Sequence, residues 1–507
     1  MRKKKSLYNI AFSLILYIIT MIFTFITQAM IVKILGIEYS GVNGLFTNIL
    51  TMLSIAELGI GSSIIFKLYE PIASNNIEKI KSWLLFYKKC YRIIAGVVFT
   101  IGIGIIPFVP IIVGKTSIND NIIVLYIISL IDVVLSYIMT YKRSLLYADQ
   151  KNYIINIVHI GYVVFMNCTQ ILIIYFTKNY LYFLLVKLLY RLCENIIINI
   201  YVNRNYSYVK ENATEINSNE KKDIYERIKA IFLQKVSFVI NKGIDNIVIS
   251  LFLGVATVGF YTNYNLIATT LCGIVFQIIS AFMASVGNLL TENNSKKNYS
   301  IYKKITFLNS MITAICISGF LCSIQPFIKI WVGDSYILDL SVILSFCIYI
   351  YSDSIRRSIT IYKEAAGICK EDKYVYIVMA LINLVFSIVL CKFMGISGVI
   401  LGTAISYLFL IFYSYPKFIF YKVFSISKKE YYYEKIEYLL IIIISSAICY
   451  FITNSLVIFN SNIISFIFNS IVSVFITLFI VLLFFHKREE LKDIIKLFNK
   501  VIRRKKI

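Results

Sequence analysis

Residues 234–254 read QKVSFVINKGIDNIVISLFLG, a stretch that is long enough to cross a membrane. About 20 residues of α-helix span the hydrocarbon core of a bilayer, which is about 30 Å thick. Yet this stretch carries two lysines and one aspartate, Lys235, Lys242 and Asp245. A charge at bilayer depth is costly, so such residues usually face a cavity or a partner. The stretch therefore predicts a membrane-spanning helix with a polar side.

The rest of the chain is equally apolar. Hydrophobic residues make up 59% of its 507 residues, and the mean hydropathy is +0.78. Apolar runs long enough to span a bilayer recur from end to end, separated by short polar stretches. We count about fourteen such runs, none with the alternation of a barrel strand. The sequence thus predicts an all-α polytopic membrane protein with about fourteen transmembrane helices.

The net charge of +24 is distributed unevenly along the chain. Most Lys and Arg residues fall in the N-terminus, in alternate loops and in the C-terminal tail, which is the pattern of segments that stay inside the cell. This pattern predicts a multi-pass protein of the cell membrane with both termini cytoplasmic, and it argues against nucleic acid as a partner. The intervening loops carry only five lysines: Lys33, Lys115, Lys178, Lys329 and Lys392.

The sequence offers little for catalysis or for metal binding. Its ten cysteines form no CxxC pair, and it has only two histidines. We therefore expect no metal site and no cofactor. The loops on the side predicted to be extracytoplasmic are about ten residues or shorter, too short for a catalytic domain. We expect that the protein is not an enzyme.

The chain contains an internal repeat. LGIEYSG (35–41) matches LGVATVG (253–259), and PFVPIIVG (107–114) matches PFIKIWVG (326–333) at nearly the same offset. An even number of spans in each repeat places both halves in the same orientation, with a substrate path between them. The predicted parts are an N-terminal six-helix bundle (1–202), a cytoplasmic linker (203–229), a C-terminal six-helix bundle (230–420), two additional helices (421–486) and a basic amphipathic tail (487–507).

Charged residues share helical faces in two of the predicted spans. Lys187, Arg191 and Glu194 follow one another at helical spacing, and so do Lys235, Lys242 and Asn246. Cations outnumber carboxylates on these faces, and a water-filled cavity that receives an anion would remove the cost of burying them. Internal salt bridges explain the same spacing. The predicted substrate-binding residues are Lys187, Arg191, Lys235, Lys242 and Asn246.

Four acidic residues lie within predicted spans, where each could bind H⁺ or Na⁺ and couple transport to a gradient. Glu194 and Asp245 are within one helical turn of a predicted substrate-binding cation. Proton or Na⁺ binding there would release the neighbouring cation for the substrate. The predicted charge-coupling residues are Glu57, Asp132, Glu194 and Asp245.

Several stretches together resemble a known family. ILGIEYSGVNGLFTNILTMLSIAELGIGSSI (34–64), YKRSLLYADQKNYI (141–154), DNIVISLFLGVATVGFYTNYNLI (245–267) and ALINLVFSIVLCKFMGISGVILGT (380–403) are similar to the polysaccharide-repeat flippases of the multidrug/oligosaccharidyl-lipid/polysaccharide exporter superfamily. The resemblance implies fourteen helices, arranged as two six-helix bundles plus two. It also implies movement of undecaprenyl-diphosphate-linked oligosaccharide from the inner to the outer leaflet, with basic residues of a central cavity on the diphosphate.

Three other functions remain open at this point. A drug or cation exporter of the same superfamily would favour an acidic cavity, a peptidoglycan-precursor flippase would share the chemistry of the substrate, and a membrane polysaccharide polymerase would need a large outer loop. The expected partners are the lipid-linked oligosaccharide, membrane lipids and H⁺ or Na⁺. We expect a monomer, working alone or beside a polysaccharide polymerase.

Overall fold

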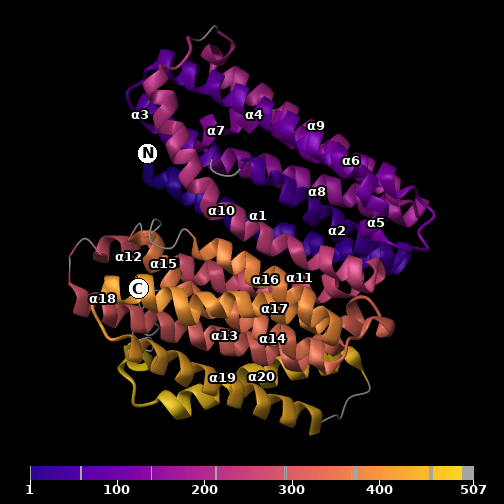
Figure 1. The fold of residues 1–507 in the computed structure, drawn as a ribbon, viewed down its shortest axis with the longest axis vertical. Helices are drawn as coiled ribbons and strands as arrows, with labels where there is room; N and C mark the ends of the chain where they lie inside the picture. The colour runs from indigo at the N-terminus through magenta and orange to yellow at the C-terminus, as the bar shows by residue number, and fades with distance from the viewer. Residues whose placement is uncertain are drawn as a thin grey trace, which may run out of the picture. The chain divides into compact units, whose positions relative to one another are not determined.

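The computed structural model contains only helices as regular secondary structure in the residues that it describes (Figure 1). The chain divides into two compact units, Met1–Thr262 and Asn263–Ile507. The side chains of some helical residues, including Lys235 and Lys242, lie outside the description. The described residues are 2–57, 60–138, 140–211, 214–290, 292, 294–366, 368, 374–455 and 461–493.

The first unit is built from long helices joined by short turns. Asparagine side chains cap two of them: Asn76 accepts a hydrogen bond from the backbone N–H of Lys79, and Asn179 accepts from that of Leu181. The helices are α1 (Arg2–Met30), α2 (Ile37–Leu53), α3 (Ile60–Ala73), α4 (Ile77–Ile105), α5 (Val109–Val113), α6 (Ile122–Ile138), α7 (Thr140–Ala148), α8 (Asn152–Thr177), α9 (Tyr180–Asn205) and α10 (Ser218–Leu253).

Helix α11 (Val255–Ser280) runs across the boundary, and the remaining helices belong to the second unit. There α13 packs against α14, α19 and α20, and α16 packs closely against α17. Two π-helical segments, 410–414 and 416–420, continue α17 into α18. The helices are α12 (Met283–Leu290), α13 (Ser295–Trp331), α14 (Leu340–Ile355), α15 (Arg357–Ala365), α16 (Val375–Met394), α17 (Ile396–Phe409), α18 (Tyr421–Phe424), α19 (Lys428–Ser455) and α20 (Asn462–Phe485).

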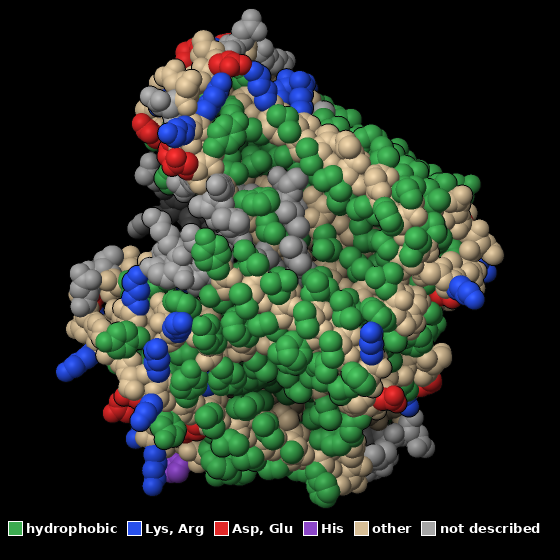
Figure 2. Space-filling model, in the orientation of Figure 1, with side chains coloured by type: hydrophobic (Ala, Val, Ile, Leu, Met, Phe, Trp, Pro, Cys, Tyr) green, Lys and Arg blue, Asp and Glu red, His purple; other side chains and the backbone are tan. Residues whose placement is uncertain are grey.

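The protein is a multi-pass membrane protein. Within the described residues, 9 helices are long and apolar enough to cross a bilayer, or up to 10 if the bent pair α6 and α7 forms one span. Many large apolar side chains on these helices are exposed, as expected where lipid is the solvent. Figure 2 shows the visible face of each unit largely covered by hydrophobic side chains, with most charged side chains toward the helix ends.

The count of about fourteen spans stays a prediction, and the structure shows why several predicted spans are not plain apolar helices. Helix α9 carries Lys187, Arg191 and Glu194 within one membrane thickness. Helix α14 ends at Ile355, where Arg356 begins a break before α15. The apolar stretch that holds α2 and α3 is interrupted after α2 by the 3₁₀ turn Ser54–Glu57. The predicted spans that are not recognised by length and hydropathy alone are therefore those that contain charged residues or a break in the helix.

The repeated motifs adopt matching backbone conformations. Gly36 and Gly254, which are equivalent in the first motif, have φ of 106° and 88°. Gly114 and Gly333, which are equivalent in the second, have φ of 71° and 128°. Because this region of φ strongly favours glycine, each pair marks the same kind of helix-terminating turn in both halves of the sequence.

Two further equivalent glycines, Gly41 and Gly259, lie at one helix crossing. A Cβ atom at Gly41 would lie 2.0 Å from the backbone oxygen of Val255, and one at Gly259 would lie 2.3 Å from that of Ile37. The start of α11 therefore crosses α2 at backbone contact distance, with each glycine facing the other helix. A side chain at either position would separate the two helices.

Several described residues of the segment predicted as a linker, 203–229, are paired with residues of α4. Lys81 Nζ lies 3.1 Å from Glu211 Oε2, and Lys79 Nζ lies 3.2 Å from Glu220 Oε1. Helix α10 already begins at Ser218 and continues through the first predicted span of the second bundle. The domain limits derived from the sequence remain predictions.

The beginning of the C-terminal tail packs on the protein. Leu491 is 6% exposed in a cluster with Phe307, Tyr438 and Phe485. Asp493 Oδ2 lies 2.7 Å from Lys304 Nζ. The Leu491 side chain therefore contacts helices of the protein rather than a lipid surface. Residues 494–507, predicted to continue an amphipathic helix, lie outside the described residues.

Candidate functional site

A cluster of charged side chains joins α6 to α9 in the first unit. Asp132 of α6 is 5% exposed, and its two oxygens contact two cations of α9. Arg191 Nε donates to Oδ1 at 3.2 Å, and Lys187 Nζ lies 3.3 Å from Oδ2. The helical spacing that placed Lys187 and Arg191 on one face thus directs both toward the same carboxylate.

The second carboxylate of the cluster, Glu194, has a fully buried side chain. Arg191 Nη1 donates to its Oε2 at 3.1 Å. Arg143 Nη2 lies 3.2 Å from Oε1, and His159 Nδ1 lies 2.8 Å from the same oxygen. Four helices contribute to this cluster, which we name the α9 network: Asp132, Arg143, His159, Lys187, Arg191 and Glu194.

Neighbouring side chains fix the orientation of the network. The Arg191 guanidinium lies over the Tyr162 ring, 4.8 Å from its centroid, and the His159 ring stacks on the same tyrosine. Asn195 accepts a hydrogen bond from Arg143 Nη2 at 3.1 Å and donates to the backbone oxygen of Leu135. Arg191 is therefore held by two carboxylates and one ring, in a single geometry.

The α9 network carries more positive than negative charge. It contains three permanent cations, Lys187, Arg191 and Arg143, against the two carboxylates of Asp132 and Glu194. A net charge inside a helical membrane protein is stabilised by a counter-ion or by water. The Lys187 side chain, at 37%, is the most exposed of the network.

The other predicted binding residues lie on α10, which packs mainly against α2, α3 and α5. Asp245 and Asn246 are both buried there. The hydroxyl group of Tyr261 donates to Asp245 Oδ2 at 3.2 Å, and Asn246 Oδ1 is buried without a hydrogen-bond partner among the described residues. The side chains of Lys235 and Lys242 lie outside the described residues, so their assignment stays a prediction.

Glu57, the remaining predicted coupling residue, lies away from α9 in the turn after α2. The hydroxyl group of Tyr91 donates to its carboxylate, and Tyr91 in turn packs edge-on against Tyr87 of α4. The structure thus places the four predicted acidic residues in three settings. Asp132 and Glu194 share the α9 network, Asp245 lies on α10, and Glu57 lies against α4.

Two members of the network were not predicted as site residues. Arg143 lies in the stretch 141–154, in one of the segments whose lysines and arginines we interpreted as loop charge. His159 is one of the two histidines of the sequence, and it was not predicted to bind a substrate or an ion. Only the fold brings them to Glu194, because they lie on α7 and α8. The one usable signal was a short arginine-containing helix directly after the span that holds Asp132.

The second unit holds a comparable cluster. Asp353 accepts from Arg356 Nη2 and Arg357 Nη2, each at 2.5 Å. Arg356 lies over the Tyr407 ring at 4.5 Å. Two guanidinium groups on one buried carboxylate leave this cluster with an excess positive charge, as in the α9 network.

The second unit also contains an apolar cavity of about 670 Å³ between α13, α14, α17 and α19. Its hydroxyl groups belong to Tyr351, Tyr450 and Ser446, and the rest of its lining is aliphatic, aromatic or thiol. Such a cavity suits a hydrocarbon chain and gives a charged ligand no partner.

No protein-family model and no curated protein matches the sequence. Solved structures do. The lipid II flippase MurJ in an inward closed conformation superposes with a TM-score of 0.70 at 13% identity, over 94% of this chain and 99% of that one. The chain has the fold of the MOP superfamily. A multidrug resistance MATE transporter of this superfamily, in its inward-facing conformation, gives a TM-score of 0.58 at 13% identity, over 77% of this chain and 91% of that one.

The MOP fold agrees with the sequence in its main feature, a long all-helical membrane protein. The two solved structures are those of a lipid II flippase and of a multidrug resistance transporter. At this identity the likeness concerns the fold alone. Any argument about a ligand of this chain must therefore rest on its own features, the α9 network and the apolar cavity.

Proposed function

We propose that the protein is a flippase that moves undecaprenyl-diphosphate-linked oligosaccharide repeat units from the inner to the outer leaflet, for capsule or cell-wall polysaccharide assembly. The observation that carries the proposal is the excess of cations in the α9 network, where Lys187 and Arg191 share Asp132. A diphosphate has enough oxygens to bind both Lys187 and Arg191 in place of the Asp132 carboxylate. Lys and Arg are the usual ligands of phosphate oxygens.

The apolar cavity supports a substrate with a lipid part. Its volume of about 670 Å³ and its aliphatic and aromatic lining would accommodate part of a hydrocarbon chain. In this proposal the diphosphate meets the cations while the chain stays in apolar surroundings, and alternating access between two bundles carries the head group across.

The same site suits a second function, the flipping of a peptidoglycan precursor. The likeness to the lipid II flippase MurJ favours this candidate. A drug or cation exporter is disfavoured, because a cationic substrate would be repelled by the net positive charge of the α9 network. The two flippase functions differ in the sugar of the substrate, and no described residue is assigned to recognise that sugar.

The network also suggests how ion binding would be coupled to transport. Protonation or Na⁺ binding at Asp132 would release Lys187 and Arg191 together, and at Glu194 it would release one side of Arg191. Release of the ion would restore the pairs and expel the diphosphate. Asp245, which is bound by Tyr261, and Glu57, which is bound by Tyr91, also remain proposed coupling residues. An inside-negative potential adds about 2.3 kcal/mol per charge per 100 mV to outward movement of an anion.

The test is transport by purified protein in liposomes, with a short-chain polyprenyl-diphosphate oligosaccharide as substrate. Lys187→Gln should lower the flipping rate strongly without unfolding the protein, because the side chain is partly exposed. Lys142→Gln is a matched control, since Lys142 is a buried cation that binds Asn203 on α9 outside the network. Equal rates for wild type and Lys187→Gln would contradict the proposal. Replacing the oligosaccharide by a peptidoglycan precursor decides between the two flippase functions.

A further inference from the structure

Helices α13 and α19 meet along a row of polar side chains whose buried polar atoms have no hydrogen-bond partner in the part of the chain that the structure describes. On α13 they recur every four residues, and on α19 two of them are one turn apart, so both sets face the contact between the helices. The buried atoms without a hydrogen-bond partner among the described residues are Tyr302 OH, Thr306 Oγ1, Ser310 Oγ, Glu434 Oε1 and Oε2, Lys435 Nζ and Tyr438 OH. We name these six residues the polar seam.

The two charged members of the seam are almost completely buried. Glu434 is 7% exposed and Lys435 is 1% exposed. Lys435 Nζ lies over two aromatic rings, 5.8 Å from the centroid of Tyr302 and 5.5 Å from that of Tyr431. Burying a carboxylate with neither oxygen hydrogen-bonded costs several kcal/mol. Such a group is normally neutralised by a proton or bound by water or an ion.

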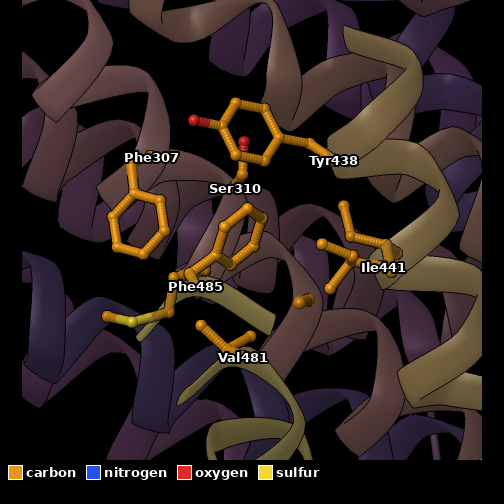
Figure 3. A pocket seen from close by; sticks show the side chains of 9 residues that line it. Phe307, Ser310, Tyr438, Ile441, Val481 and Phe485 are labelled. Atoms are coloured by element: carbon orange, nitrogen blue, oxygen red, sulfur yellow. The ribbon is translucent and has the colours of Figure 1, made fainter. Parts of the chain in front are cut away.

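A small pocket continues the seam on its apolar side. Ser310 and Tyr438 line it together with Phe307, Ile441, Val481 and Phe485 (Figure 3). Its volume of about 10 Å³ is close to the minimum for one water molecule, so it cannot take a bulky ligand. A larger ligand than water or a bare ion is therefore excluded at this end.

The other end of the seam leads to a polar pocket of about 210 Å³ at the lysine-rich start of α13. Tyr299 and Lys303 line this pocket and also act electrostatically on the seam, Lys303 on Glu434 and Tyr299 on Tyr302. The charge distribution of the sequence predicts that this end is cytoplasmic. Water can therefore enter the pocket that is lined by Lys303, and the charge of Lys303 acts on Glu434.

We propose that the polar seam is a proton-binding site, in which the Glu434 carboxylate takes a proton that enters through the pocket beside Lys303. One proton moves from water to a carboxylate oxygen, and the resulting acid is neutral, which removes the cost of burying a charged carboxylate that has no hydrogen bonds. The seam lies on a helix pair outside the α9 network and does not depend on the identity of the transported substrate.

Charged groups on each packed element act on this site. The cations are Lys435 on α19, Lys303 on α13 and Arg488 after α20, and the additional acid is Glu490. The tyrosines of the seam, together with Tyr299 and Tyr431, complete the surroundings. The three cations stabilise the ionised form and Glu490 opposes it. Loss or gain of the proton therefore changes the electrostatic balance where the tail is attached.

The test is infrared difference spectroscopy of the purified full-length protein in liposomes, comparing acid and alkaline conditions. We expect a carbonyl stretching band of one protonated carboxyl group that is absent in Glu434→Gln. Glu437→Gln is the matched control on the same helix: Glu437 is 42% exposed and pairs with Arg488, so the band should persist. In Tyr438→Phe the band should shift in frequency, because a hydroxyl group in the electrostatic surroundings of Glu434 is lost.

Three results would overturn the proposal. The first is a spectrum in which Glu434→Gln retains every protonated carboxyl band of the wild type. The second is a band that disappears when Na⁺ is added at constant pH, which would assign the seam to a metal cation. If Glu434→Gln does not fold, Tyr438→Phe and Thr306→Val decide, and unchanged band positions in both would exclude a proton at the seam.

Discussion

Arg191 on α9 donates from Nε to Asp132 Oδ1 on α6 at 3.2 Å, while its Nη1 donates to Glu194 at 3.1 Å. One guanidinium is therefore shared between a carboxylate of its own helix and one of a neighbouring helix. Lys187, one turn earlier, contacts the other oxygen of Asp132. Asp132 thus occupies the position on these two cations that an anionic substrate would need.

Replacing Asp132 by asparagine should strengthen anion binding. The change keeps the shape of the side chain but removes the charge that competes for Lys187 and Arg191. We expect the affinity for a polyprenyl diphosphate to rise by about tenfold, or about 1.4 kcal/mol. Titration calorimetry in detergent measures it. Glu57→Gln, which changes a carboxylate outside the α9 network, should leave the affinity unaltered. Weaker binding by Asp132→Asn would contradict this competition.

The crossing of α2 and α11 should not tolerate a side chain. Gly41→Ala and Gly259→Ala each place a methyl group against backbone, which cannot move aside as a side chain would. We expect each variant to lose about 1–3 kcal/mol of stability or more, seen as a lower thermal midpoint. Gly96→Ala is the control, since a Cβ atom there meets nothing within 4 Å. A midpoint for Gly41→Ala equal to that of Gly96→Ala would refute the close crossing.

The fold class could be predicted from the sequence because hydropathy, charge distribution and the repeat all point to the same architecture. The paired glycines Gly36 and Gly254 show that the repeat extends to backbone conformation. The span count was harder to predict, because α9 and α14 carry charges or breaks that hydropathy alone cannot distinguish from loops.

The site was predictable only where its residues share one helix. The spacing of Lys187, Arg191 and Glu194 gave their common face, since helical period is a local property. It could not indicate that Asp132 lies opposite two of them, or that Arg143 and His159 reach Glu194. Those contacts depend on how α6, α7 and α8 pack around α9, and packing is not encoded in the periodicity of any one segment.

The attachment of the tail depends on Leu491. Its buried side chain and the pair between Arg488 and Glu437 hold the start of the tail against α13 and α19. Leu491→Asp would bury a charge in an apolar cluster, so the segment should detach. Trypsin cleavage after Lys487, Arg488 and Lys492 should then be several-fold faster. Lys492→Asn changes an exposed neighbour and is the control: cleavage after Lys487 and Arg488 should be as slow as in the wild type. If Leu491→Asp is also cleaved at the wild-type rate, the tail is not attached through Leu491.

A pH effect is expected at Glu38, at the start of α2. Burial by itself raises the pKa of Glu38, but hydrogen bonds from Thr116 Oγ1 and the backbone N–H of Ser117 outweigh it and lower the pKa overall. A lowered pKa means that the ionised form stabilises the fold above the ordinary value of 4.5, and that this stabilisation is lost as the pH falls through the folded-state pKa.

Glu38→Gln should therefore be less stable than the wild type at neutral pH, by about 1 kcal/mol or less for a group that is largely hydrated. The difference should shrink as the pH is lowered below the ordinary pKa. Thermal midpoints of both proteins across this pH range measure it. A difference that is independent of pH would mean that the carboxylate charge does not contribute.

The most direct test of the central claim is calorimetric titration of a short-chain polyprenyl diphosphate into the Asp132→Asn/Arg191→Gln double variant. The pair of changes removes a cation together with a partner carboxylate, which limits the destabilisation that a lone buried charge would cause. If Arg191 holds the diphosphate, affinity should fall at least about tenfold below that of Asp132→Asn alone, or by about 1.4 kcal/mol or more. An affinity equal to that of Asp132→Asn, in a protein that remains folded, would contradict the account.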